Sequence, residues 1–346
     1  MSAWPRVTVI VPCRNEARYL DACLDSLLDG RYPADRLEVL VVDGRSDDGS
    51  REIAAARAAR HPAVRVLDNP ARVVPAALNL GIRAASGEVI ARADAHVVDP
   101  PDYLTRLAGA LRDSGADNVG GRLETLPAHD GPVARAIALA LSHPLGVGNA
   151  HFRIGTARPR WVDTVPFGCY RRDVFSRIGL FDEELVRNQD DEFNLRLLRR
   201  GGRLLLLPDV VARYFARGSY RQVARMFYQY GLFKPLVARK VGRIMTARQL
   251  VPPAFVALLA GGAALALAWP PARAPWTLLL VAYAAVVLAA AASAARAHGL
   301  RCAAALAATF PVLHLSYGFG FLRGLWGLLT DRGRRPRDPA AVPLSR

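Results

Sequence analysis

Two side chains that commonly bind divalent cations lie two residues apart in Asp94-Ala95-His96. They follow the mainly apolar run 88–93, which is typical of a buried β-strand. Open α/β sheets bind ligands at the carboxyl ends of their strands, where a cation can neutralise a diphosphate leaving group. The tripeptide therefore indicates phosphate chemistry at a sheet edge. In the alternative interpretation, Asp94 caps a turn and His96 is a solvated loop residue.

A second polar segment follows another apolar run and reads Asp43-Gly44-Arg45-Ser46-Asp47-Asp48-Gly49-Ser50. Its carboxylates can accept hydrogen bonds from a base or a ribose, although Asp, Gly and Ser also form turns and helix caps. The first apolar run leads into Pro12-Cys13-Arg14-Asn15-Glu16, which contains no glycine. Because the G-x-G-x-x-G fingerprint is absent there, the sequence argues against a dinucleotide-dependent oxidoreductase.

The elements that position these residues are short β-rich runs that alternate with helical patterns. The expected strands are Val7–Val11, Val39–Val42, Val64–Leu67 and Val89–Ala93, and the expected helices are Ala17–Leu28, Ser50–Arg60, Val74–Ala84 and Tyr103–Arg112. This alternation predicts βαβ units and an α/β fold with a mainly parallel sheet.

The C-terminal part contains three stretches without Asp, Glu, Lys or Arg, which are Gln249–Trp269, Ala274–Ala295 and Cys302–Leu322. Each is about the 20 residues that cross a bilayer core, so we expect membrane helices rather than buried core helices. The third is the weakest, because Pro311 interrupts it and Arg323 follows it. Three crossings would also export the arginines at 332–337, against the positive-inside tendency.

Composition favours a membrane surface over nucleic acid as the partner. The 346-residue chain has a formal net charge of +16 and no nucleic-acid-binding signature. Basic residues between Arg225 and Arg248 precede the first apolar stretch, where they can meet anionic headgroups. The four cysteines form no metal-binding or disulfide pattern, and the opening apolar run is too short for a leader. We therefore expect a catalytic part in the reducing cytoplasm.

Taken in order, the polar segments resemble family 2 glycosyltransferases over roughly residues 5 to 235. The matching segments are Val9 to Glu16, Val41 to Gly49, Ala77 to Gly81 with Ala85 to Gly87, Asp94 to His96, and Asn188 to Glu192 with Arg196. Within that family, Val162 to Arg172 is similar to membrane-attached enzymes of bacterial exopolysaccharide assembly of the succinoglycan glucosyltransferase type.

The resemblance implies a GT-A fold with a nucleotide-sugar site. The residues that would bind the donor are Pro12, Asn15, Glu16, Asp43, Asn79, Asp94 and Arg225. Of these, Asp43 would hydrogen-bond the base, and Asp94 would face the sugar or ribose. His96 replaces the second aspartate of the family's Asp-x-Asp and would bind the metal with Asp94. Imidazole favours Mn²⁺, although Mg²⁺ also fits such sites.

The resemblance assigns Asp190 as the general base of an inverting transfer, with Asp191 as the second candidate. An inverting transfer needs a carboxylate that accepts the acceptor hydroxyl's proton as its oxygen attacks the anomeric carbon. The family's preceding glutamate is Gln189 here, which removes a charge beside the base and is expected to lower its pKa. Glu192 and Arg196 are spaced to pair on one helical face.

Gln222-Val223-Ala224-Arg225-Met226 is similar to the QxxRW element of processive relatives, with Met226 in place of the aromatic residue. In that element the arginine faces the diphosphate, and the resemblance implies the same role for Arg225. The aromatic and basic segment from Tyr220 to Val237 predicts a helix in the membrane interface, and a plain packing helix is the alternative.

These interpretations predict four regions: a GT-A catalytic domain (1–218), an amphipathic interfacial segment (219–248), a transmembrane unit of about three helices (249–329) and a basic tail (330–346). The expected enzyme is a multi-pass protein of the inner membrane. It would move one sugar from a nucleotide-diphosphate donor, UDP-linked in our prediction, to a polyprenyl-diphosphate-linked glycan. A processive polysaccharide synthase and a catalytically inactive membrane scaffold are the alternatives.

Overall fold

The computed structural model describes residues 4–242 and 246–330. By contacts these residues form two compact units. The first contains 4–124 and 155–214, and the second contains 125–154 and 215–330 apart from 243–245. The predicted basic tail and Arg243 lie outside the described residues. The predicted domain boundaries remain predictions, and we did not expect residues 125–154 to pack with the C-terminal helices.

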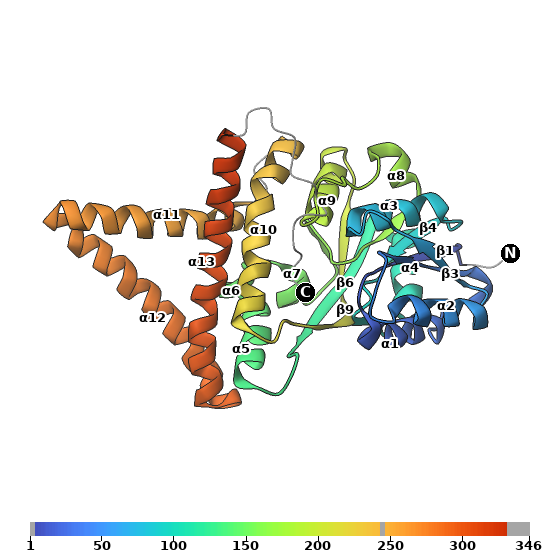
Figure 1. Cartoon of the computed structure of the whole chain (residues 1–346), viewed down its shortest axis with the longest axis horizontal. Helices are drawn as coiled ribbons and strands as arrows, with labels where there is room; N and C mark the ends of the chain where they lie inside the picture. Colours follow the sequence, from blue (N-terminus) through green and yellow to red (C-terminus); the bar gives the residue numbers. More distant parts are fainter. Residues whose placement is uncertain (1–3, 243–245, 331–346) are drawn as a thin grey trace. The chain divides into compact units, whose positions relative to one another are not determined.

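One half of the sheet in the first unit is parallel, as predicted (Figure 1). Its strands are β1 (Val7–Cys13), β2 (Leu37–Asp43), β3 (Val64–Asp68) and β4 (Val89–Arg92), in the order β3-β2-β1-β4. Every residue of β2 and β4 is buried, which is expected where helices cover both faces of a parallel sheet. The parallel register aligns Cys13 with Asp43, so the loops after β1 and β2 leave the sheet at one edge.

The connecting helices are amphipathic and close to the predicted ranges. They are α1 (Ala17–Leu28), α2 (Ser50–Arg60), α3 (Val74–Ala84) and α4 (Tyr103–Ser114). In α1, Leu20, Cys23, Leu24 and Leu27 are buried at helical spacing. Gly81 of α3 lies against Ile10, where an added Cβ would approach a side-chain carbon to 2.5 Å. Glycine therefore permits the close contact between α3 and β1.

The other half of the sheet is antiparallel, so the nine-stranded sheet is mixed rather than uniformly parallel. It contains β5 (Val97–Val98), β6 (Asn118–Leu126), β7 (Arg160–Trp161), β8 (Cys169–Arg171) and β9 (Leu204–Phe215), and the helices of this part are α8 (Asp173–Ile178) and α9 (Gln189–Arg199). The short helix η1 (Ala34–Arg36) belongs to the parallel half, where it precedes β2. Several of these strands have only two or three residues, which is too short for a periodic sequence signal.

The second unit is helical. It contains α5 (Pro132–Leu141), α6 (Pro144–Val147), α7 (His151–Ile154), α10 (Tyr220–Val241), α11 (Ala247–Ala268), the short helix η2 (Pro270–Ala272), α12 (Arg273–His298) and α13 (Leu300–Thr330). Three of its helical segments, within 248–268, 270–298 and 300–330, are long and apolar enough to cross a membrane. The helix α13 is continuous through Pro311.

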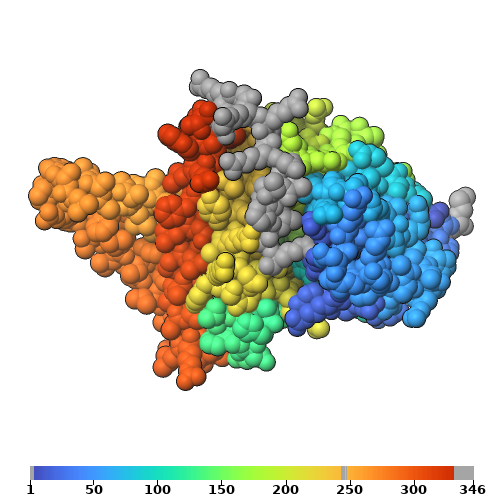
Figure 2. Space-filling model, viewed as in Figure 1, coloured from blue at the N-terminus to red at the C-terminus, as the bar shows by residue number. Residues whose placement is uncertain are grey.

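Within this unit, α10 and α13 lie side by side (Figure 1). A Cβ added at Gly320 would come within 2.1 Å of the Tyr228 carbonyl oxygen, and one at Gly324 within 2.2 Å of that of Leu232, so the two backbones are in close contact. By contrast, much of α11 and α12 is uncovered on the face shown in Figure 2, and Leu267 and Leu278 are 84% and 68% exposed.

Candidate active site

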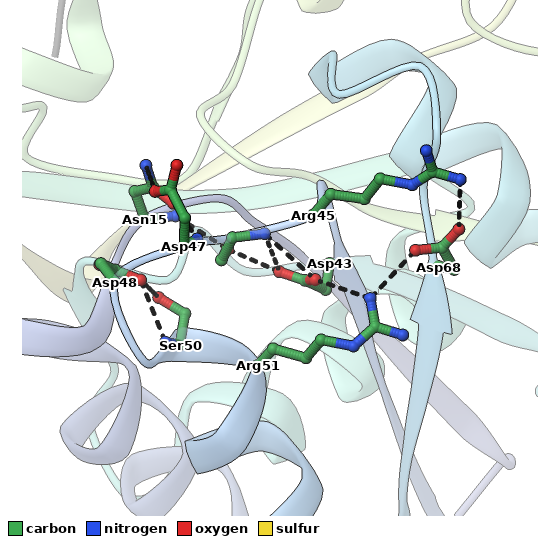
Figure 3. A network of polar contacts seen from close by, with 9 residues as sticks. Asn15, Asp43, Arg45, Asp47, Asp48, Ser50, Arg51 and Asp68 are labelled. Atoms are coloured by element: carbon green, nitrogen blue, oxygen red, sulfur yellow. Dashed lines mark hydrogen bonds and ion pairs between the residues drawn. The ribbon is translucent and has the colours of Figure 1, made fainter.

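Figure 3 shows the acidic turn after β2, which is organised around Asp43. The Asp43 side chain is only 1% exposed. The Ser46 hydroxyl donates a 2.6 Å hydrogen bond to Asp43 Oδ1, and Arg51 Nη1 lies 3.4 Å from Asp43 Oδ2. The same Arg51 nitrogen is 3.1 Å from Asp68, which also pairs with Arg45 at 3.4 Å. These contacts fix the turn before any ligand arrives. We refer to Asp43, Arg45, Ser46, Arg51 and Asp68 as the turn network.

The loop after β1 is bonded to this turn. Asn15 adopts a left-handed backbone conformation with φ 56°, and its amide N–H donates to the Ser46 hydroxyl at 3.0 Å. The Glu16 amide N–H donates to Ser50 Oγ at 2.8 Å. Pro12, at the end of β1, is only half-buried. The structure thus brings Pro12, Asn15 and Glu16 to the sheet edge that carries Asp43, and their roles in donor binding remain predictions.

Asp94 and His96 follow β4 at the same edge. The Nδ1 atom of His96 lies 3.5 Å from Oε1 of Glu16, which joins the β4 loop to the β1 loop. Among the described residues, no group of three or more His, Cys, Asp and Glu side chains could hold a metal ion. Cations such as Mg²⁺ often take only one or two protein carboxylates and complete their coordination with substrate phosphates. Asp94 and His96 fit a site of that kind.

Arg92, the last residue of β4, connects Asp94 with the predicted base. Its Nε and Nη2 atoms lie 2.9 and 2.8 Å from Asp94 Oδ1, and its Nη1 atom lies 3.5 Å from Asp190 Oδ2. We call these three residues the arginine cluster. The sequence interpretation missed Arg92. The sequence feature that could have identified it is a charged residue inside an apolar strand. Burying such a charge is costly unless it is paired.

Asp190 lies in the first turn of α9, where the helix dipole favours a negative charge. Burial nevertheless raises the pKa of its carboxyl above the ordinary value, the charge of Asp191 adds to the rise, and Arg92 opposes it. The side chain keeps 37% of its surface exposed. It is therefore accessible to an acceptor and becomes a stronger base than an ordinary aspartate. Its role as the base, and that of Asp191 as the second candidate, remain predictions.

Two other sequence candidates make mainly structural contacts. The Asn79 amide donates to the Phe181 carbonyl at 2.9 Å and to Glu183 at 2.7 Å, and its oxygen accepts from the Phe181 amide at 2.9 Å. Asn79 thus attaches α3 to the segment before α9, and its donor-binding role remains a prediction. Arg196 donates to Glu192 at 2.7 Å, which confirms the expected helical pair.

Arg225 lies on α10 in the second unit, where its side chain is exposed. Met226, which replaces the aromatic residue of the QxxRW element, is 2% exposed. The predicted contact of Arg225 with a diphosphate remains a prediction.

Comparison with known proteins places these residues in a family. Residues 8–179 match the model of Glycosyl transferase family 2. The succinoglycan biosynthesis protein ExoA of Rhizobium meliloti is 31% identical over 261 residues, which cover 75% of this chain and 78% of that protein. A dolichyl N-acetyl-alpha-D-glucosaminyl phosphate 3-beta-D-2,3-diacetamido-2,3-dideoxy-beta-D-glucuronosyltransferase of Methanococcus voltae is 26% identical, covering 68% of this chain and 74% of that protein.

The fold is also shared with a solved structure. The mannosyltransferase PcManGT from Pyrobaculum calidifontis, in complex with GDP-Man and Mn²⁺, matches 96% of this chain and 89% of that chain, with a TM-score of 0.54 and 23% identity. This likeness confirms the predicted GT-A fold, and the relationship to ExoA confirms the predicted family. The chain belongs to glycosyl transferase family 2.

Proposed function

We propose that this glycosyltransferase inverts the anomeric centre and adds a single sugar from a nucleotide-diphosphate donor to a lipid-linked acceptor. The observation that supports this most is the pairing of Asp94 and Asp190 with one arginine, because it joins a candidate donor-binding carboxylate to a candidate base. The two carboxylates belong to different elements, so their meeting is a property of the fold rather than of one loop.

In the proposed reaction, the acceptor hydroxyl oxygen attacks the anomeric carbon of the donor sugar. A new carbon–oxygen bond forms as the bond to the diphosphate breaks, the hydroxyl proton passes to Asp190, and the nucleoside diphosphate leaves. A general base of this kind contributes about 10²- to 10⁴-fold to the rate. Asp43 and the turn network would orient the nucleoside, since they are already fixed at the sheet edge.

We propose Mn²⁺ or Mg²⁺ as the cofactor, held by Asp94 and His96. PcManGT is described with Mn²⁺ and GDP-Man, which supports a divalent metal in this fold. Such a cation, when bound, would neutralise charge on the leaving diphosphate. Electrostatic stabilisation of this type is often the largest single contribution to catalysis.

We propose a polyprenyl-diphosphate glycan as the acceptor. The names of two relatives refer to succinoglycan biosynthesis and to a dolichyl-linked sugar phosphate. A chain with apolar helices long enough to enter the bilayer would restrict its search for such an acceptor to the membrane surface. Arg225, Arg239 and Lys240 on α10 are exposed and suited to phosphates or anionic headgroups.

For the membrane arrangement, we infer that α11 and α12 cross the inner membrane as a hairpin and that the catalytic unit is cytoplasmic. The helix α10 is unsuited to crossing because charges occur along its whole length, at Arg221, Arg225, Lys234, Arg239 and Lys240. The helix α13 packs along α10, so we expect both to lie at the membrane surface. Two crossings would keep the arginines at 332–337 on the cytoplasmic side.

The proposed function is tested with the full-length protein in nanodiscs, a panel of nucleotide sugars and a polyprenyl-diphosphate sugar, with products identified by mass spectrometry. We expect one donor to give a lipid product heavier by a single sugar residue, and no reaction with the free acceptor sugar at the same concentration. A ladder of products would indicate a processive synthase. Absence of both transfer and donor hydrolysis with every donor would refute the proposal.

A further inference from the structure

We propose that Arg92 is a positioning residue that aligns the donor-side carboxylate of Asp94 with the acceptor-side carboxylate of Asp190. The inference rests on the proposed function, because it assigns Arg92 a task in the same reaction. Its basis is the geometry of the guanidinium, which is planar and offers donors in several fixed directions. Two of its nitrogens lie against Asp94 Oδ1, while the third lies 3.5 Å from Asp190 Oδ2.

A comparison with Arg196 separates positioning from ordinary structural pairing. Arg196 in α9 donates to both Glu192 oxygens, at 2.7 and 2.9 Å, and to the carbonyl oxygens of Ile178 and Leu180. Arg92 is more buried, at 9% exposure, yet its buried Nη1 atom has no hydrogen-bond partner among the described residues. A purely structural arginine would be expected to satisfy that nitrogen. The long approach to Asp190 leaves the base room to adjust when an acceptor binds.

The loop before β8 contacts Arg92 at both its backbone and its guanidinium. The Gly168 carbonyl accepts a hydrogen bond from the Arg92 amide at 3.0 Å, and the Phe167 ring centre is 6.0 Å from the guanidinium carbon of Arg92. Phe167 and Gly168 have φ values of 59° and 80°. The first is costly for a bulky residue, and such strain is concentrated at functional sites.

Glycine at 168 has a second requirement, because an added Cβ would meet the Tyr170 ring at 2.5 Å. The loop is therefore shaped to bring Phe167 over Arg92 while Tyr170 remains in β8. This gives a physical task to Val165-Pro166-Phe167-Gly168-Cys169, a segment for which the proposed reaction has no other use.

The expected consequence is that a lysine at position 92 cannot replace the arginine. A single ammonium retains the charge, but it cannot hold two carboxylates in fixed directions. We expect Arg92→Lys to lower single-turnover transfer at saturating donor by about 100-fold, since misalignment of about 1 Å has an effect of that size. Donor affinity should fall several-fold, because Asp94 loses two contacts.

The test measures the dissociation constant of the nucleotide-sugar donor by calorimetry, single-turnover transfer and Tm in the full-length protein. The variants are Arg92→Lys, Asp190→Asn and their combination, with Arg196→Lys as the matched control. We expect Arg92→Lys to have a much smaller further effect on transfer once Asp190 is Asn, because its effect on chemistry passes through that carboxylate. Arg196→Lys should lower Tm and leave transfer per folded molecule unchanged.

Phe167→Leu provides a second probe if Arg92→Lys folds poorly, and we expect it to reduce transfer several-fold without changing the charge. Unchanged transfer and affinity in both variants would overturn the inference, as would additive losses in the combined variant. Those results would contradict the role of Arg92 but not the proposed function. Failure of the wild-type protein to transfer sugar would instead contradict the proposed function itself.

Discussion

The turn network and the arginine cluster are both built from aspartates and arginines, but they differ in how completely the charges are satisfied. In the turn network, one buried aspartate receives a serine hydroxyl and an arginine, and Arg45 and Arg51 remain 50% and 49% exposed. In the arginine cluster, a single arginine with 9% exposure serves two carboxylates.

This difference separates binding from chemistry. A network whose bonds are made in advance loses little entropy when a ligand arrives, so it suits recognition. A buried arginine between two partly exposed carboxylates, with one unsatisfied nitrogen, suits a reaction in which charge moves. Variants in the turn network should therefore change mainly donor affinity, and variants in the arginine cluster should change mainly the transfer step.

The largest effect is expected for Asp190→Asn. This change removes the proton acceptor, so we expect transfer to fall by about 10³-fold while nucleotide binding changes little. Rapid-quench measurement of single-turnover transfer gives the first quantity, and calorimetry with the nucleoside diphosphate gives the second.

Asp191→Asn is the matched control for this prediction, because it makes the same chemical change at the next position. It should retain much more activity, since the carboxylate that lies 3.5 Å from Arg92 is that of Asp190. The reverse order of activities would assign the base to Asp191.

Asp94→Asn and His96→Ala should each reduce turnover by about 10²- to 10³-fold, because both weaken the stabilisation of the leaving diphosphate. Excess Mn²⁺ should restore part of the activity in each variant, as seen in a titration of initial rate against metal concentration. If both variants were as active as the wild-type protein in EDTA, the metal site would be assigned wrongly.

The turn network was easier to predict from the sequence than the arginine cluster. Asp43 follows an apolar run, and parallel strands bring such positions to one edge of a sheet, so local pattern was sufficient for this aspartate. In the arginine cluster the same pattern identified Asp94 but neither of its partners. Asp190 was identified only through the family resemblance. Its contact with Arg92 joins the end of β4 to the start of α9, and no local periodicity encodes a pairing between elements so distant in sequence.

The second unit shows the same limit. The apolar stretches were visible by length and composition, and all three are helical. The packing of residues 125–154 with these helices was not visible, because it depends on contacts such as that of His314 Nε2 with the Leu145 carbonyl at 2.7 Å. Likewise, Phe167 gave no sequence signal for its positive φ, since bulky residues rarely adopt it.

The pH dependence of transfer should also distinguish the two regions. Burial raises the pKa of Asp190, and the base acts only when ionised. As pH falls, kcat/KM should therefore begin to decline at a higher pH than the ordinary aspartate value of about 3.9 would give. Nucleotide affinity should not decline over the same pH range, because Asp190 is outside the turn network. A decline in kcat/KM that begins only near the ordinary value would contradict the assignment.

The smallest effect is expected for Asp43→Asn. Loss of the charge weakens the bonds of Asp43 with Ser46 and Arg51 and any hydrogen bond to the nucleobase of the donor. We expect a loss of donor affinity of about tenfold. Transfer at saturating donor should remain within about threefold of wild type, because the arginine cluster is untouched. Arg65→Gln, which removes a partly exposed ion pair with Glu38 away from both regions, provides a control that should change neither quantity.

The separation of binding from chemistry is tested most directly by measuring donor dissociation constants and single-turnover transfer side by side for Asp43→Asn and Asp190→Asn. We predict a crossed result: Asp43→Asn weakens donor binding and retains transfer at saturation, and Asp190→Asn retains donor binding and loses transfer by about 10³-fold. Equal losses of binding in both variants, or full transfer by Asp190→Asn, would contradict the account.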